Sequence, residues 1–217
     1  MQKSSILIEL PYLPCIQFFS KIIQGKVYLE QCENYSKGSY RNRCHIAGAQ
    51  GLQVLSIPLK GGKHQQQSIR EVLISHETPW GSQHWTAIKS AYGKSPFFEF
   101  YADELYPFFT KKYEYLWEWN WDLLQALIQL LQMDAEIERT EIYQKQVSEG
   151  IIDFRNGISP KPHKALPDTS FSPFKYGQVF EDKNGFIPNL SILDLLFCTG
   201  PEAVYILGKC VIDNDEG

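Results

Sequence analysis

A short basic segment, residues 35–45, holds the densest group of side chains that could bind a ligand. Lys37, Arg41 and Arg43 place three positive charges close together in a chain whose formal net charge is −4. If residues 39–47 form a strand, Arg41 and Arg43 lie on one face, because alternate side chains of a strand point the same way. Two guanidinium groups so placed could bind a phosphate or carboxylate through paired hydrogen bonds.

Carboxylates in the preceding segment offer these arginines a different partner. Glu30 and Glu33 come at the end of a predicted strand over residues 27–31, and either could form an ion pair with Arg41 or Arg43. In that case the arginines serve the fold rather than a ligand. The residues alone leave both interpretations open.

Two side chains have the chemistry of a general base. Glu30 stands at a strand end, where α/β proteins place ligands, and could take a proton from an attacking amine. His84 is expected in the first turn of a helix, where the helix dipole favours a neutral imidazole. Cys32 would be a nucleophile only if a nearby cation lowered its pKa. The alternative for all three is a structural role in ion pairs or in the core.

The sequence lacks the motifs of several known kinds of functional site. The five cysteines, at positions 15, 32, 44, 198 and 210, have no paired spacing, and the histidines have no ligand spacing, so we expect no metal site and reduced thiols. Phosphate-binding loop, dinucleotide-binding and G-x-S-x-G motifs are absent, and no pattern identifies a cofactor. A pI of about 5.8 gives no electrostatic case for nucleic acid.

The predicted secondary structure that must position these residues changes along the chain from mostly strands to mostly helices. We expect strands over residues 5–10, 27–31, 39–47, 52–59 and 69–75, and helices over residues 15–23, 82–92, 99–109, 118–133 and 191–198. Ser82 and the Ser191-x-x-Asp194 pattern are the expected helix caps. The fold class is therefore mixed α/β (α+β), with strands and one early helix first and helices after.

One domain is expected over residues 1–217, because a chain of 217 residues fits a single core. Its parts are a strand-rich part over 1–75, a helical part over 76–145, a Pro-rich extended loop over 156–175, and a C-terminal segment over 176–217. Glutamines interrupt the most apolar stretch, Leu123–Leu131, which is too short to span a membrane. Acidic and proline residues interrupt the apolar run at 6–19, so we expect no signal peptide and a cytoplasmic protein.

Motifs spread along the chain resemble the WbqC-like family. They are Pro11-Tyr-Leu-Pro14, Phe18-Phe19-x-Lys21-Ile22, Tyr40-Arg-Asn-Arg43, the end of the strand at Ser56–Leu59, Trp80 with His84, Tyr92 with Pro96-Phe97-Phe98, and Asn189–Phe197. Together they cover almost the whole chain in the family's order. The version Tyr40-Arg-Asn-Arg-Cys44 resembles members from the Bacteroidetes branch.

The resemblance implies a role in synthesis of O-antigen and other surface polysaccharides. For some members the suggested activity is transfer of an amino-acid or acyl group to an amino sugar, here from a phosphate-bearing donor or with a nucleotide sugar. The substrate-binding residues would be Tyr12, Lys37, Tyr40, Arg41, Asn42 and Arg43. Glu30 or His84 would deprotonate the attacking amine. The alternative is a non-catalytic protein that recognises a sugar-phosphate or a partner enzyme of the pathway.

Two acids depart from the family's pattern. Many members begin Gln-Pro-x-Tyr where this chain has Glu9-Leu10-Pro11-Tyr12, and many carry Asp where this chain has Glu30. If these positions touch the substrate, ligand choice differs from that of the sugar-pathway members.

Overall fold

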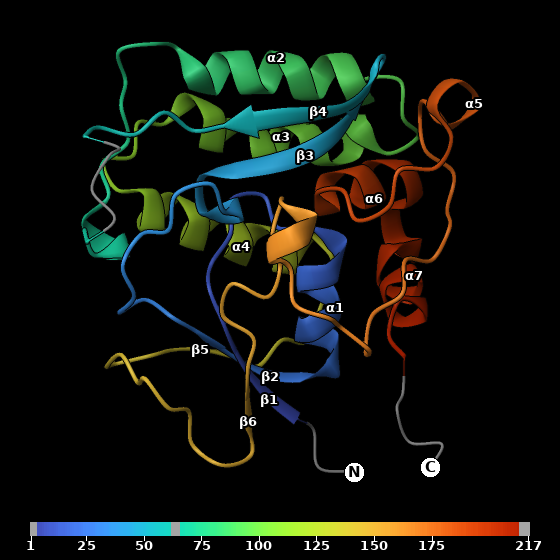
Figure 1. Cartoon of the computed structure of the whole chain (residues 1–217). Helices are drawn as coiled ribbons and strands as arrows, with labels where there is room; N and C mark the ends of the chain where they lie inside the picture. The colour runs from blue at the N-terminus through green and yellow to red at the C-terminus, as the bar shows by residue number, and fades with distance from the viewer. Residues whose placement is uncertain (1–3, 62–65, 213–217) are drawn as a thin grey trace.

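A four-stranded parallel sheet forms one end of the molecule (Figure 1). The computed structural model describes residues 4–61 and 66–212. The strands stand in the order β5-β2-β1-β6, and their bounds are β1 Ser4–Ile8, β2 Gly25–Leu29, β5 Ile137–Arg139 and β6 Ile151–Asp153. Since all four strands run the same way, their carboxyl ends share one edge.

Helix α1, Ile16–Gln24, connects β1 to β2 and covers one face of the sheet. Phe18, Phe19 and Ile22 recur at helical spacing and are buried. Cys15 is the N-cap residue, and Gly25 follows the last turn. The predicted early helix is therefore confirmed to within a residue at each end.

An antiparallel hairpin and three helices make up the opposite end of the molecule. The hairpin joins β3, Arg43–Gly48, to β4, Gly51–Ser56. Helices α2 (Trp80–Tyr92), α3 (Phe98–Thr110) and α4 (Leu116–Leu130) pack beside one another, with α2 against β3. In Figure 1, α2 lies above the hairpin and α4 lies between the hairpin and the sheet.

A fully buried tryptophan, Trp119 of α4, joins these elements. Its ring lies 4.8 Å from that of Tyr12, 5.9 Å from Trp80 and 5.8 Å from Phe109. Aromatic rings at such separations add packing energy to the burial of their surface. The β1–α1 loop, α2, α3 and α4 thus share one core.

The C-terminal part returns to α1. It contains α5 (Glu181–Asn184), α6 (Ile192–Thr199) and α7 (Ala203–Lys209), and α7 packs on α1 (Figure 1). The remaining elements are 3-10 turns: η1 Tyr40–Asn42, η2 Ile69–Glu71, η3 Pro162–Lys164 and η4 Gly200–Glu202. None of the described helices has the length and apolar character needed to cross a membrane.

The mixed fold with strands first and helices after is confirmed, but several expected elements differ. The strand predicted over 39–47 begins only at Arg43, because Tyr40–Asn42 forms a 3-10 turn that Ser39 caps. The strand predicted over 69–75 is a 3-10 turn followed by isolated bridges. Helix α2 begins at Trp80, so Ser82 is not its cap.

At α6 only one of the two predicted capping residues, Ser191, is a cap. Ser191 accepts a hydrogen bond from the backbone of Leu193 at 3.4 Å. The Asp194 carboxylate instead accepts hydrogen bonds from the Tyr176 hydroxyl at 2.6 Å and the Gln178 amide at 2.9 Å. Asp194 therefore fixes the C-terminal loop and does not cap its own helix.

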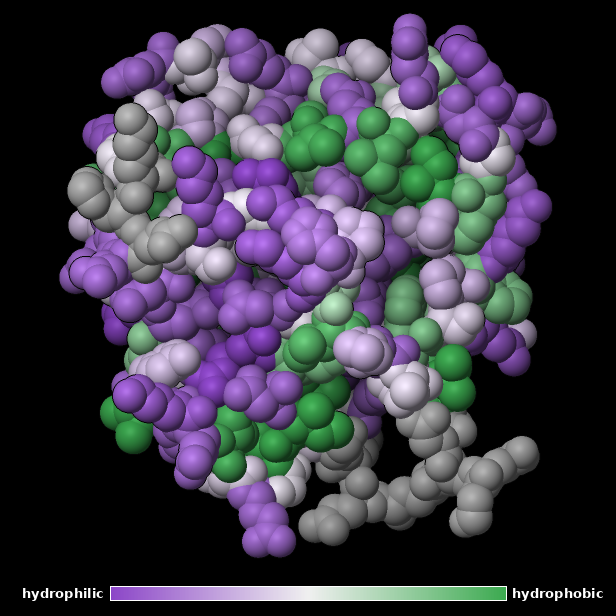
Figure 2. Space-filling view, viewed as in Figure 1, coloured by the Kyte–Doolittle hydropathy of each residue, from purple (hydrophilic) through white to green (hydrophobic). Residues whose placement is uncertain are grey.

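Figure 2 shows a front surface that is mostly hydrophilic, with apolar groups gathered near the hairpin and again at the sheet end of the molecule. Leu52 and Val54 of β4 are about half exposed. Single exposed apolar residues are ordinary in monomers.

Candidate functional site

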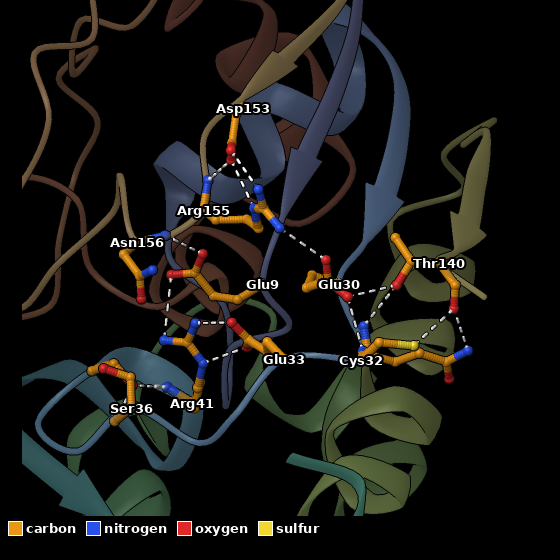
Figure 3. A network of polar contacts seen from close by, with 12 residues as sticks. Glu9, Glu30, Cys32, Glu33, Ser36, Arg41, Thr140, Asp153, Arg155 and Asn156 are labelled. Atoms are coloured by element: carbon orange, nitrogen blue, oxygen red, sulfur yellow. Dashed lines mark hydrogen bonds and ion pairs between the residues drawn. The ribbon is translucent and has the colours of Figure 1, made fainter. Parts of the chain in front are cut away.

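Polar side chains from all four parallel strands meet beyond the carboxyl edge of the sheet (Figure 3). Glu9 follows β1, Glu30 follows β2, Thr140 follows β5, and Asp153 is the last residue of β6. Ligands of open α/β sheets bind at this edge, outside the strand ends. The topology therefore points to this cluster as the candidate site.

Glu30 is completely buried at the centre of the cluster. Its Oε1 accepts hydrogen bonds from the Cys32 backbone at 2.8 Å and from the Thr140 hydroxyl at 2.7 Å. Its Oε2 accepts one from Arg155 Nη1 at 3.1 Å. Both oxygens thus have partners, and the orientation of the carboxylate is set by three separate segments.

Arg155 connects this carboxylate to the segment between β5 and β6. Its Nε and Nη2 donate to the two oxygens of Asp153 at 2.9 and 2.6 Å. Nη1 donates both to Glu30 and to the Gln144 carbonyl, at 2.9 Å for the latter. The guanidinium also lies 4.9 Å from the ring of Tyr143.

A second ion pair stands beside the first. Arg41, only 1% exposed, donates from Nε to Glu33 Oε1 at 2.6 Å, and its Nη1 lies 3.8 Å from Glu9 Oε1. Glu9 Oε2 in turn accepts from the Asn156 backbone at 2.7 Å. Burial raises the pKa of Glu33 to about 7, against the opposing effect of Arg41.

These contacts favour the structural interpretation of Arg41, and its role in binding an anion stays a prediction. Because Arg41 lies in a 3-10 turn and Arg43 in the strand that follows, the expected shared strand face does not exist. Arg41 pairs with Glu33, which was the structural alternative. Arg43 has no acidic partner among residues 4–61 and 66–212, and its buried Nε has no hydrogen-bond acceptor there.

A pocket of about 400 Å³ opens on the face of the sheet opposite α1. Its floor includes Leu7, Tyr28 and Glu30, and residues of the β5–β6 segment form its wall. Glu138, Arg139 and Glu141 also line it, and Glu138 is paired with Lys26 at 2.7 Å, so the lining carries charges of both signs and can hydrogen-bond a hydroxyl-rich ligand. Small-molecule sites have volumes of roughly 300–1,000 Å³.

The other expected binding residues are spread more widely. Lys37 is exposed. The Tyr40 hydroxyl lies 3.1 Å from His45 Nδ1, and Asn42 accepts from the Tyr35 hydroxyl at 3.0 Å. Tyr40 and Asn42 therefore position the start of the hairpin.

His84 lies in the aromatic core rather than in the carboxylate cluster. Its Nδ1 is 2.7 Å from the hydroxyl of Tyr12, and its ring packs against that of Trp80. Burial lowers the pKa of His84 to about 4, although a hydrogen bond with the Ser56 backbone opposes this shift. No described contact joins His84 to Glu30, so the two predicted bases are not brought together.

Sequence analysis did not identify three members of the cluster, Thr140, Asp153 and Arg155. They belong to strands of three residues or follow them, and such short strands show no alternating pattern. Glu9 was visible as an acid near the end of the strand predicted over residues 5–10, the same signal that identified Glu30. Within the described chain, no group of three or more His, Cys, Asp or Glu side chains is arranged to hold a metal ion.

Comparisons with known proteins found two matches that include most residues of this site. The model of the WbqC-like protein family matches residues 11–158, a span that contains Glu30, Arg41 and Arg155 but not Glu9. The uncharacterized protein Rv1507c of Mycobacterium tuberculosis is 28% identical over 231 residues, covering 96% of this chain and 99% of that protein. No solved structure gives a significant match.

Proposed function

Because the chain belongs to the WbqC-like protein family, we propose that it is a transferase of surface-polysaccharide biosynthesis that binds an amino sugar at the carboxyl edge of its sheet. The observation that carries this proposal is the buried Glu30 at the floor of a pocket of about 400 Å³ that is lined by charged and polar residues. The association of the family with surface polysaccharides supports the pathway.

In this proposal Glu30 is the general base. The ammonium group of the sugar first gives one proton to a Glu30 oxygen, and the neutral amine then attacks the acyl carbon of a phosphate-bearing donor. The bond from the acyl carbon to the phosphate oxygen breaks, and the phosphate leaves with the electron pair and with the second proton of the amine. Arg139 lines the pocket and is the cation that would bind this phosphate. Arg43 lacks an acidic partner in the described structure but is not among the residues that line the pocket.

The pocket suits the sugar ring. Tyr28 supplies an apolar face, and carboxylates at positions 138 and 141 can accept hydrogen bonds from hydroxyl groups. His84 has no part in the reaction proposed here, because the core encloses it and its partner is Tyr12.

One observation favours the non-catalytic alternative. Both oxygens of Glu30 already accept hydrogen bonds, which is the state of a carboxylate that maintains a binding site. On this reading the protein recognises a sugar-phosphate or a partner enzyme without turning it over.

Titration with glucosamine tests the proposal. We expect heat of binding with glucosamine, at least tenfold weaker binding with N-acetylglucosamine, and a similar loss for Glu30→Gln, a difference of about 1.4 kcal/mol or more. Glu104→Gln, an exposed acid on α3, is the matched control and should bind as wild type does. Equal affinity for both sugars would contradict an amino-sugar site.

A second experiment separates enzyme from binder. Protein, glucosamine and acetyl phosphate are incubated together, and the acylated sugar is measured by mass spectrometry. Product formation that Glu30→Gln abolishes supports the transferase, whereas binding without product from this or other acyl phosphates supports the alternative.

A further inference from the structure

The segment over residues 141–150 covers the pocket but is weakly attached to the rest of the protein. Every residue in it is exposed except Val147, which is half-buried. Segments with few buried contacts open at low free-energy cost, and ligand-gating loops are drawn from them. The attachment of this segment therefore depends on a small number of polar contacts.

Arg155 makes the main contact to it. One nitrogen, Nη1, donates to the Gln144 carbonyl and to Glu30 Oε2, while the guanidinium lies against the Tyr143 ring. The same atom therefore holds the segment and binds the carboxylate of Glu30, a residue that lines the pocket; Figure 3 shows the contact with Glu30.

The other two guanidinium nitrogens have a separate anchor. Nε and Nη2 bind Asp153, two residues earlier in the chain. Because the guanidinium is planar, Nη1 can leave Glu30 and Gln144 only if Arg155 and Asp153 turn together as one ion pair, and in that motion the side chain keeps its charged partner. Arg155 can therefore exchange its contacts with Glu30 and Gln144 while it keeps its ion pair with Asp153.

Building on the proposed function, we propose that Arg155 latches residues 141–150 over the pocket and that the ammonium group of an amino sugar releases this latch by replacing Nη1 at Glu30 Oε2. The exchange is one cation for another, so the buried carboxylate keeps a counter-charge throughout. A neutral N-acetylated sugar supplies no charge and leaves the latch closed. Arg155 is thus a positioning residue that couples recognition of the amine to opening of the pocket.

The rate at which endoproteinase Lys-C cleaves at Lys145, the lysine within this segment, measures how often the segment opens when no ligand is present. We expect Arg155→Gln to be cut there at least fivefold faster than wild type, with mass spectrometry identifying the fragments. Arg70→Gln, an exposed arginine, should leave the rate unchanged. The double variant Glu30→Gln/Arg155→Gln removes both buried charges and serves if the single variant unfolds. Wild-type rates in folded Arg155 variants would overturn the latch.

Glucosamine and N-acetylglucosamine then test the opening ligand. We expect saturating glucosamine to speed cleavage at Lys145 severalfold, N-acetylglucosamine to leave it unchanged, and Glu30→Gln to abolish the difference. If glucosamine binds with no change in cleavage, the inference fails while the proposed function stands. If glucosamine does not bind and Arg155→Gln still frees the segment, the amino-sugar function fails while the latch itself stands.

Discussion

Arg41 and Glu33 form a two-point ion pair in the interior, with Nε 2.6 Å from Oε1 and a second hydrogen bond from Nη2 to Oε2. Eight residues separate them, and the 3-10 turn at Tyr40–Asn42 turns the guanidinium back toward the end of β2. This pair, with Glu9 beside it, supports the loop that carries Glu30 into the site.

Replacing Arg41 with Met should therefore destabilise the fold. The change leaves Glu33 and Glu9 buried without their cation, and breaking a buried pair in this way costs about 3–5 kcal/mol. Chemical denaturation measures the loss in the free energy of unfolding. Arg41→Lys should rescue little, because an ammonium cannot form the paired bonds. Arg70→Met is the surface control, and a loss under about 1 kcal/mol for Arg41→Met would contradict this account.

The buried imidazole of His84 predicts a loss of stability in acid. Burial lowers its folded-state pKa from 6.5 to about 4, so the unfolded state binds the proton more readily. The stability that neutral His84 contributes is present above pH 6.5 and is lost as the pH falls toward 4. Between pH 7 and pH 5 this loss is about 2 kcal/mol relative to His84→Gln.

The comparison with His84→Gln is needed because Glu33 acts in the opposite direction. Its raised pKa of about 7 adds stability as the pH falls toward 4.5, in wild type and variant alike. Urea denaturation at both pH values gives the difference directly. Equal pH dependence in the two proteins would show that folding does not shift the pKa of His84.

Lys21 and Asp168 should behave as a coupled pair. Lys21 is 2% exposed on α1, and its Nζ donates to Asp168 Oδ1 at 2.6 Å and to Ser170 at 2.7 Å. We expect Lys21→Met and Asp168→Asn each to lower the free energy of unfolding by about 3 kcal/mol, since each leaves a buried charge unpaired. The double variant should cost about as much as one single change. Additive losses in this double-mutant cycle would show that the pair is not coupled.

Two helical glycines should respond to Ala in opposite directions. At Gly81 of α2 a Cβ would lie 2.3 Å from the Phe109 carbonyl oxygen, so helices α2 and α3 would be forced apart. We expect Gly81→Ala to destabilise by about 1–3 kcal/mol. Gly208 in α7 has open space around its Cβ position, and Gly208→Ala should stabilise by about 0.5 kcal/mol. Thermal unfolding of both variants gives the two signs, and a shift in the same direction would contradict the packing account.

Strong local patterns predicted the larger elements. Helices α1, α3 and α4 and the hairpin follow from apolar periodicity and glycine turns, which act over a few residues. The strands of three residues, β5 and β6, were missed because their pairing with β2 and β1 comes from distant segments. The 3-10 turn at Tyr40–Asn42 was read as strand because alternation alone does not detect a local cap such as Ser39.

The sequence by itself determined the mixed α/β class, the family, and the position of Glu30 at a strand end, since each depends on short local patterns and, for the family, on their order along the chain. Only the tertiary structure decided what surrounds Glu30. Parallel pairing of four strands brings Thr140 and Arg155, more than a hundred residues away, to the same edge as Glu30. It also placed Arg41 in an ion pair and His84 in the core, because burial requires each charge or polar group to find a partner.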